Sequence, residues 1–306
     1  MKTIDDYIKE SISYRKILNK IRRDDNVREV YEKYPDLAKI DEEIIASRKD
    51  VMIRILRKEN RSENEFERED KLLLKREDFI REHGIDSNFD SPCVTCNLCK
   101  DIGYVLNEKG SKRVCSCMNQ EYEECVLASG MQDYESIRLE GYSKSKSGSR
   151  IREAVKKEIC DLLAAEASDR ATSICIYSDY ASSGKTYLAI CLCKLAIMTC
   201  RSAYYCKAES LGNFSDDGNY GMMDSCKNCD MLIVDDFSSD VAKLFKTASA
   251  LSELLEIRNM KGALTILVTR EPVSELRDDI DYRIEGKLRS ARVLGDIKCE
   301  YLMVQI

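Results

Sequence analysis

The sequence predicts an α/β protein, in which a parallel sheet flanked by helices forms the second half of the chain. Three observations lead to this prediction. From residue 151 onward, short apolar runs alternate with longer runs that have helical periodicity. Residues 1–90 instead carry apolar side chains at helical spacing among many charges. Between residues 91 and 125 the helical period stops and cysteines occur in pairs.

Four segments of the second half have the length and composition of buried strands. They are residues 173–177, 202–208, 230–236 and 264–269. Helices are expected between and around them, over 151–167, 185–200 and 249–261. Strands that alternate with helices form parallel sheets covered on both faces. We therefore expect one domain over 151–306, after a linker and lead-in at 126–150.

Residues 1–90 are expected to be helical throughout, with Pro35 at a helix start and Gly84 just past a helix end. Their apolar stripes are narrow and the rest of each helix is charged. This pattern is typical of a solvated helical bundle or of a helical surface that binds a partner, and the sequence leaves both open.

The composition indicates a soluble protein with an ordinary core. The chain has 306 residues, of which 43% are hydrophobic and 34% charged, and its formal net charge is −6. That charge excludes a global basic field for nucleic acid. No signal peptide or apolar run long enough to cross a bilayer is evident. With 15 cysteines, a reducing cytoplasm is the expected location, with thiols free or metal-bound.

A phosphate-binding turn is predicted where the strand at 173–177 meets the following helix. Gly184, Lys185 and Thr186 supply the end of the G-x-x-x-x-G-K-[ST] pattern, although Asp179 replaces its first glycine. Backbone amides at a helix N-terminus bind phosphate oxygens. We expect Lys185 to reach the β- and γ-phosphates of ATP and the Thr186 hydroxyl to ligate Mg²⁺. The neighbouring residues that complete the expected nucleotide site are Ser182, Ser183 and Tyr187.

An acidic strand end lies about 50 residues downstream. The apolar run at 231–234 ends in Asp235 and Asp236, as a Walker B strand does. Asp235 is expected to hold Mg²⁺, and Asp236 to orient or activate the attacking water. A glycine-lysine-threonine turn and an acidic strand end in one α/β pattern together predict a nucleotide site.

The cysteine pairs predict a structural zinc site. Cys96, Cys99, Cys115 and Cys117 have the spacing C-x₂-C-x₁₅-C-x-C, which suits a tetrahedral zinc bound by four thiolates. Cys93 is an alternative to Cys96 or Cys99. A redox site and unconnected buried thiols are the competing interpretations of the module. A second pair, Cys226 and Cys229, is interpreted as a turn followed by a core thiol.

With these motifs in place, the chain resembles the DnaC/DnaI-type helicase loaders, which are AAA+ ATPases. The resemblance covers most of the chain and is carried by seven segments. They are "VREVYEKYPDLAKIDEEI", "CNLCKDIGYV" followed by "CSC", "YESIRLEGYS", "GKTYLA" with "MLIVDDF", and "LLEIRNMKGALTILVTREPVSEL". It implies an AAA+ P-loop domain preceded by a helical region and a zinc-binding module.

The resemblance implies a role in the initiation of DNA replication. Residues 1–90 would bind a hexameric replicative helicase of the DnaB/DnaC type, and the ATPase domain would bind ATP and contact single-stranded DNA. Homo-oligomerisation on the helicase ring would accompany this. Arg270 would occupy the sensor 1 position, and Lys287 the arginine-finger position, with Arg283 and Arg289 nearby.

Departures from the family pattern affect hydrolysis more than binding. Ser182 replaces a P-loop glycine, and Arg270 replaces the usual polar sensor residue. Lysine at the finger position lacks the planar fork of arginine. The expected activity is therefore that of a weak ATPase. The alternatives are an ATP-binding adaptor that has lost hydrolysis and an ATPase helper of transposition of the IstB type. The basic run at 144–157 is interpreted as a solvated face in preference to a DNA contact.

Overall fold

The computed structural model describes residues 2–57, 63–107, 110–137, 173–177, 184–214, 220–271, 284 and 292–294. The chain divides into two compact units, one formed by Ser11–Ile102 and the other by Met1–Glu10 together with Gly103–Ile306. The helix expected at 151–167 lies outside the described residues. None of the described helices combines the length and apolarity that crossing a membrane requires.

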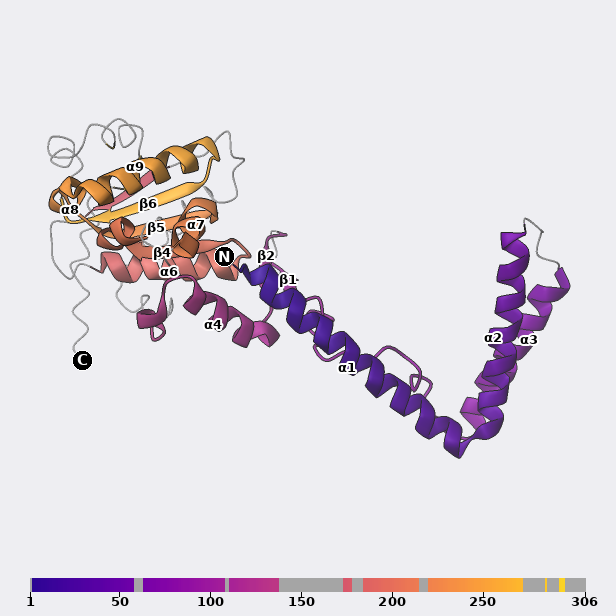
Figure 1. Ribbon diagram of the computed structural model, residues 1–306. Coiled ribbons are helices and arrows are strands. Elements are labelled where there is room, and N and C mark those ends of the chain that lie inside the picture. The colour runs from indigo at the N-terminus through magenta and orange to yellow at the C-terminus, as the bar shows by residue number, and fades with distance from the viewer. Residues whose placement is uncertain are drawn as a thin grey trace. The chain divides into compact units, whose positions relative to one another are not determined.

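Three helices make up most of the described N-terminal region, as the sequence predicts (Figure 1). They are α1 (Ile4–Lys33), α2 (Pro35–Leu56) and α3 (Glu63–Glu82). Pro35 opens α2 because its missing N–H falls where a helix has no intrahelical acceptor. Gly84 ends α3 with φ +62°, and the Ile85 amide donates to the Ile80 carbonyl, which satisfies the last turn of the helix.

A small core holds the helices of the Ser11–Ile102 unit together. Leu37, Ile80 and Phe89 are buried at its centre. The Arg76 guanidinium bridges Asp41 and Asp90, both at 2.6 Å, and the Tyr31 hydroxyl donates to Asp41 at 2.7 Å. Since these groups are largely screened from water, the network contributes more than an exposed pair would.

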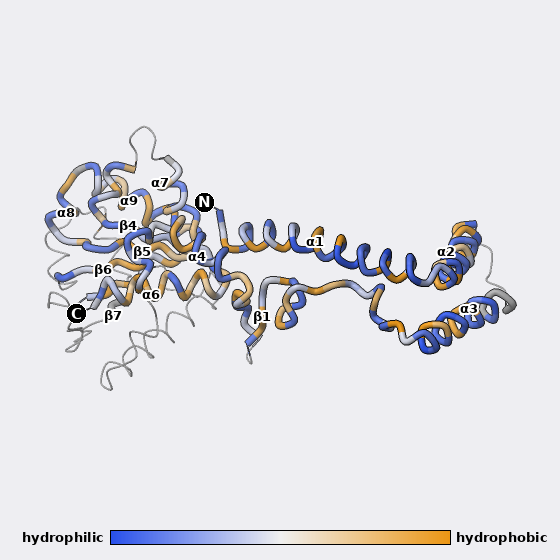
Figure 2. Tube along the Cα trace, turned by 90° about the horizontal axis from the view of Figure 1, so that it is seen from below, coloured by the Kyte–Doolittle hydropathy of each residue, from blue (hydrophilic) through white to orange (hydrophobic). Residues whose placement is uncertain are grey.

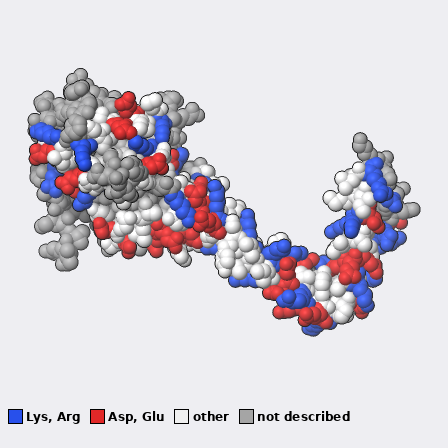
Figure 3. Space-filling view, in the orientation of Figure 1, with Lys and Arg blue, Asp and Glu red and all other residues white. Residues whose placement is uncertain are grey.

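The outer surface of these helices is a mixture of charges (Figure 3). Neighbouring lysine, arginine and acidic side chains pair along single helices, as Arg28 does with Asp25 and Lys39 with Asp36. Exposed pairs of this kind each contribute at most about 1 kcal/mol. These ion pairs keep the helix surfaces solvated but do not determine how the helices pack.

A short hairpin and a helix follow the N-terminal region. Strand β1 (Tyr104–Leu106) pairs antiparallel with β2 (Lys112–Val114). The 3₁₀ turn η1 (Ser116–Met118), helix α4 (Asn119–Ala128) and the 3₁₀ turn η2 (Gln132–Tyr134) come next. Helix α4 buries Cys125 and Val126 in its second half.

The remainder of the described chain is organised around a parallel sheet, which confirms the predicted α/β class. Its strands are β3 (Ser173–Tyr177), β4 (Ala203–Lys207), β5 (Met231–Phe237), β6 (Leu264–Thr269) and β7 (Arg292–Leu294), in the spatial order β4-β5-β6-β3-β7. All neighbours are parallel. The first four match the predicted strands, whereas the sequence did not suggest β7.

Helices cover both faces of this sheet (Figure 1). Helix α6 (Lys185–Met198) lies on one face, and α7 (Tyr220–Asn228) and α9 (Phe245–Met260) lie on the other. The 3₁₀ segment η5 (Ala208–Asn213) packs against α9, and the short helix α8 (Ser239–Lys243) precedes it. Figure 2 shows the apolar residues gathered in the strands and in α6. Continuous apolar sequence is expected in a strand whose two faces are both buried.

Candidate functional site

A cavity of about 790 Å³ opens at the carboxyl ends of the parallel strands. It is lined by the start of α6, by the ends of β4, β5 and β6, and by residues of η5 and α8. Its lining residues include all the described members of the predicted nucleotide site, which are Gly184, Lys185, Thr186, Tyr187, Asp235, Asp236 and Arg270. In open α/β sheets, ligands bind outside the carboxyl ends of the strands. The cavity is therefore where the fold places a ligand.

The start of α6 has the backbone geometry of a phosphate-binding turn. Gly184 is its N-cap, with φ +85°, a left-handed conformation that glycine adopts without steric cost. The first intrahelical hydrogen bond runs from the Leu188 amide to the Gly184 carbonyl at 2.9 Å. The amides of the first turn have no intrahelical acceptor and carry the positive end of the helix dipole. Ser182, Ser183 and Asp179 lie outside the described residues.

The two acids at the end of β5 face different surroundings. A register shift between Val234 and Phe237 marks a bulge at this point, and Asp236 has φ +54°. Bulges re-aim side chains next to functional sites. As a result, the Asp235 side chain is buried, whereas Asp236 is exposed and its carboxylate lies 3.9 Å from the Lys207 ammonium. The burial of Asp235 is compatible with a metal ligand, and the exposure of Asp236 with an acid that contacts solvent.

Both oxygens of the Asp235 carboxylate accept a hydrogen bond from the protein. The Asp236 amide donates to Oδ1 at 2.8 Å, and the Tyr205 hydroxyl donates to Oδ2 at 2.9 Å. Burial raises the pKa of Tyr205, and its hydrogen bond to Tyr134 and the charge of Asp235 raise it further. Tyr205 therefore stays protonated and remains a donor. A carboxylate has about four lone-pair sites, so Asp235 keeps acceptor capacity for a metal or its waters.

The end of β6 completes the rim of the cavity. Arg270 is exposed there. Next to it, Glu271 accepts hydrogen bonds from the Ser239 amide at 2.8 Å and from the Ser239 hydroxyl at 3.3 Å. Glu271 thereby ties the β6 end to the first turn of α8. Arg283, Lys287 and Arg289, predicted around the arginine finger, lie outside the described residues.

Sequence reasoning missed several residues that line the cavity. Lys207 is the last residue of β4, Glu209 lies in η5 directly after it, and Glu271 follows β6. The rule that ligands bind beyond the carboxyl ends of parallel strands could have identified them from the predicted strands at 202–208 and 264–269. Tyr205 is different. Only the pairing of β4 with β5 reveals that its hydroxyl reaches Asp235.

No protein-family model matches the sequence, and no curated protein matches it either. Solved structures do match, over about half of the chain. Structures of DnaA, DnaI and DnaC are among them. AMPPCP-bound DnaA from Aquifex aeolicus matches with 16% identity and a TM-score of 0.42, over 49% of this chain and 48% of that one.

A DnaI structure matches with 15% identity and a TM-score of 0.41, over 55% of this chain and 90% of its own. The DnaC helicase loader matches with 16% identity and a TM-score of 0.40, over 55% of this chain and 97% of its own. The matched region spans about half the length of the DnaA structure.

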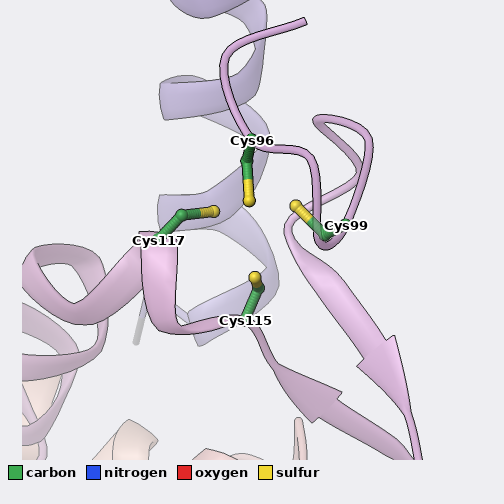
Figure 4. Close-up of side chains that lie close together, drawn as sticks. All are labelled: Cys96, Cys99, Cys115 and Cys117. Carbon is green, nitrogen blue, oxygen red and sulfur yellow. The ribbon is translucent and has the colours of Figure 1, made fainter.

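Four cysteines form a second candidate site, a metal centre (Figure 4). The sulfur atoms of Cys96, Cys99, Cys115 and Cys117 all lie within 4.8 Å of one another and point toward a common centre. A tetrahedral zinc with Zn–S bonds of about 2.3 Å needs S···S separations of about 3.8 Å. The four thiols therefore fit zinc, and they are the four predicted. Cys93 is not a member of the cluster.

Local backbone geometry brings the two cysteine pairs together. Lys100 and Asp101 both have positive φ, at +51° and +56°, so the chain reverses directly after Cys99. The Lys100 amide donates to the Cys96 carbonyl at 2.8 Å, and the Cys115 amide donates to the Gly103 carbonyl at 2.9 Å. The first bond closes the turn around the first cysteine pair, and the second aligns the end of β2 with the start of β1.

The Asp101 carboxylate organises the first pair. It accepts hydrogen bonds from the Thr95 amide at 2.7 Å, from the Cys96 amide at 2.9 Å and from the Asn19 side-chain amide at 2.8 Å. Partners outside the ligand set orient metal ligands and tune their affinity. Asp101 thus holds the backbone of Cys96 in place and ties this loop to α1. The sequence pattern of the cysteines gave no indication of its role.

Proposed function

We propose that this chain binds ATP with Mg²⁺ in the cavity at the sheet edge and uses the nucleotide as a switch. One observation carries the proposal. The turn at Gly184–Thr186 and the acidic end of β5 line the same cavity, although β6 separates their strands in the sheet. A chance glycine-lysine-threonine turn would have no reason to meet a buried aspartate. Their meeting in one cavity supports the prediction that the two motifs form a single nucleotide site.

Each residue has a role that its position allows. The α6 amides and Lys185 would bind phosphate oxygens, while Thr186 and Asp235 would hold Mg²⁺. Asp236, which faces solvent, would orient the attacking water. Arg270 would contribute charge from the end of β6. When bound, ATP would supply the terminal phosphoanhydride bond, and its presence or hydrolysis would set the state of the switch. Arg283, Lys287 and Arg289 remain the proposed source of an arginine finger.

We further propose that the switch controls the delivery of a hexameric replicative helicase to single-stranded DNA in a cytoplasmic setting. The sequence resemblance to DnaC/DnaI-type loaders supports this function. The helices of the N-terminal region add a second argument, because they expose large apolar side chains. Tyr14, Ile17 and Ile21 follow helical spacing on α1, and Ile45 and Met52 are exposed on α2. Exposed apolar stripes of this kind favour partner binding over a purely solvated bundle.

The zinc centre is proposed as structural. Four thiolates fill a tetrahedral coordination sphere and leave no open position for a reaction. The stretch around the cysteines is short and buries little surface of its own. Metal binding therefore supplies folding free energy that packing alone cannot.

Titration calorimetry of the full-length protein with ATP–Mg²⁺ tests the switch. We expect saturable binding by the wild type and binding weakened by about 10- to 100-fold in Lys185→Ala, since a charged hydrogen-bonding group is lost. Lys246→Ala, an exposed lysine on α9 outside the cavity, serves as the control. Absence of heat with a well-folded wild type would refute the ATP site.

Co-purification with a replicative helicase, with and without ATP, tests the loader function. We expect helicase to be retained by the full chain and the amount to depend on ATP in the wild type but not in Lys185→Ala. Recovery of a transposase without any helicase would instead support the transposition helper.

Hydrolysis separates the loader from the adaptor that only binds ATP. An ATPase predicts turnover, stimulated by helicase or single-stranded DNA, that Asp236→Asn reduces. An adaptor predicts ATP binding with turnover no greater than that of Lys185→Ala.

A further inference from the structure

A chain of hydrogen bonds runs from outside the sheet to the aspartate proposed to hold Mg²⁺. The Tyr134 and Tyr205 hydroxyls lie 3.2 Å apart, and the Tyr205 hydroxyl donates to Asp235 at 2.9 Å. An ionised carboxylate only accepts, so Tyr205 must donate to it. The Tyr205 oxygen is then the acceptor for Tyr134. The direction of the whole chain follows: Tyr134 to Tyr205 to Asp235.

The geometry of this chain is well defined. The Tyr205 side chain is buried on β4, and the two tyrosine rings meet edge to face at 5.3 Å and 76°. The other oxygen of Asp235 is held by the Asp236 amide. Two donors, one on each oxygen, determine the rotation of the carboxylate. Without the tyrosine, only the local bond to the following residue would orient it.

Tyr134 belongs to a segment, residues 129–137, that rests on the edge of the sheet. Strand β4 is an edge strand, and its Tyr205 amide donates to the Ser129 carbonyl at 3.0 Å. Gly130 has φ +84°, and a Cβ there would lie 2.1 Å from the Tyr205 carbonyl oxygen. Only glycine permits so close an approach. The segment therefore covers the edge strand directly beside Tyr205.

The same segment is attached to the helix that begins with Lys185. The Lys194 ammonium on α6 donates to the carbonyls of Tyr134, Glu135 and Ile137, at 2.8, 3.2 and 2.8 Å. A lysine has three protons to donate, and these bonds close the end of η2. Residues 129–137 thus contact both the phosphate-binding helix and the strand that orients the metal-binding acid.

We propose that Tyr205 is a positioning residue for Asp235 and that the segment at 129–137, through Tyr134, sets how strongly nucleotide binding depends on Mg²⁺. The inference rests on the proposed ATP site and adds its regulation. A movement of the segment that breaks the Tyr134–Tyr205 contact removes the donor that orients the Tyr205 hydroxyl, and so weakens its hold on the carboxylate. The two tyrosines thereby couple the lead-in of the domain to the metal half of the site.

Fluorescent ATP titrations with Mg²⁺ and with EDTA test the proposal in the full-length protein. The quantity of interest is the ratio of the two dissociation constants. Tyr205→Phe keeps the ring and removes the hydroxyl, and we expect the Mg²⁺-dependent gain in affinity to fall by about tenfold, as for other partners of metal ligands. The EDTA value should stay unchanged. Tyr134→Phe should give a smaller loss of the same kind.

Tyr204→Phe provides a matched control. It is the adjacent residue on β4 and is buried in the core cluster that includes α9, so its side chain lies on the opposite face. Its Mg²⁺ ratio should equal that of the wild type. A Tyr205→Phe ratio equal to the wild-type ratio would overturn the inference and leave the ATP site standing. If the wild type binds no nucleotide, the proposed function fails and the inference fails with it.

A metal-specific measurement covers the case in which Tyr205→Phe folds poorly. Mn²⁺ binding in the presence of saturating nucleotide can be followed by electron paramagnetic resonance with the Tyr134→Phe protein. Weaker Mn²⁺ binding at unchanged nucleotide affinity supports the coupling. Unchanged Mn²⁺ binding refutes it.

Discussion

At the scale of single residues, Arg258 shows how a buried charge is accommodated in this sheet domain. Its side chain is fully buried on α9. The guanidinium donates to the carbonyls of Cys226, Cys229 and Leu264 at 2.6–2.8 Å, and to the Thr265 hydroxyl at 2.8 Å. The planar fork of arginine allows all four bonds at once. It joins the end of α7 to the starts of β5 and β6.

Arg258→Ala should therefore destabilise the sheet domain by roughly 3–5 kcal/mol, because buried carbonyls lose their donors. Arg258→Lys should recover only a small part, since an ammonium cannot reach all four acceptors. Urea unfolding followed by circular dichroism measures both. Arg113→Ala, at an exposed position on β2, should change stability by less than about 0.5 kcal/mol. Equal midpoints for Arg258→Ala and Arg113→Ala would contradict the assignment.

At the scale of elements, the hairpin β1–β2 leads directly into Cys115, one of the four clustered cysteines. Tyr104 on β1 donates to Asp5 at 2.6 Å, and the Lys112 ammonium lies 3.5 Å from the centroid of the Tyr104 ring. These contacts attach the hairpin to the start of α1. The strands themselves are three residues each. Such a hairpin is marginal alone, so the metal is expected to hold it.

Metal analysis of the purified full-length chain should find one zinc per molecule. Cys115→Ser should lower the zinc content to well below one, because a thiolate ligand is lost, whereas Cys93→Ser should retain it. Removal of zinc from the wild type by a chelator should lower the melting temperature. Full zinc occupancy in the Cys115→Ser protein would show that these four thiols are not the site.

At the scale of the whole molecule, the thiols couple stability to alkaline pH. Burial raises the pKa of Cys175 to about 12 from an ordinary value of 9, and it raises that of Cys191 to about 12 as well. In the unfolded chain these thiols ionise near pH 9. Between pH 9 and 12 the unfolded state thus binds fewer protons than the folded state. Linkage then requires that stability fall as pH rises through this window.

We therefore expect a melting temperature that changes little between pH 7 and 8 and decreases above pH 9. Each such thiol contributes up to about 1.4 kcal/mol per pH unit inside the window. Differential scanning calorimetry across pH 7–10.5 measures the effect. Cys175→Ala should flatten the alkaline slope relative to the wild type, whatever its effect at pH 7. An identical slope in the variant would contradict the contribution of Cys175.

Much of this architecture follows from local patterns in the sequence. Apolar runs bounded by turns predicted four strands, because a strand buried on both faces must be apolar throughout. The spacing of the cysteines predicted the four thiols that converge, and the turn at Gly184–Thr186 predicted the start of α6. These features depend on neighbouring residues, so periodicity and spacing determine them.

Other features were decided only by the tertiary structure. The insertion of β6 between β3 and β5, the bulge that turns Asp235 inward and Asp236 outward, and the reach of Tyr205 to Asp235 depend on which strands pair. Asp101 likewise acts on Cys96 through a reversal of the chain. Such contacts join residues from different elements, and their energies appear only when the whole fold brings those elements together. The pattern of residues along the sequence therefore does not predict these contacts.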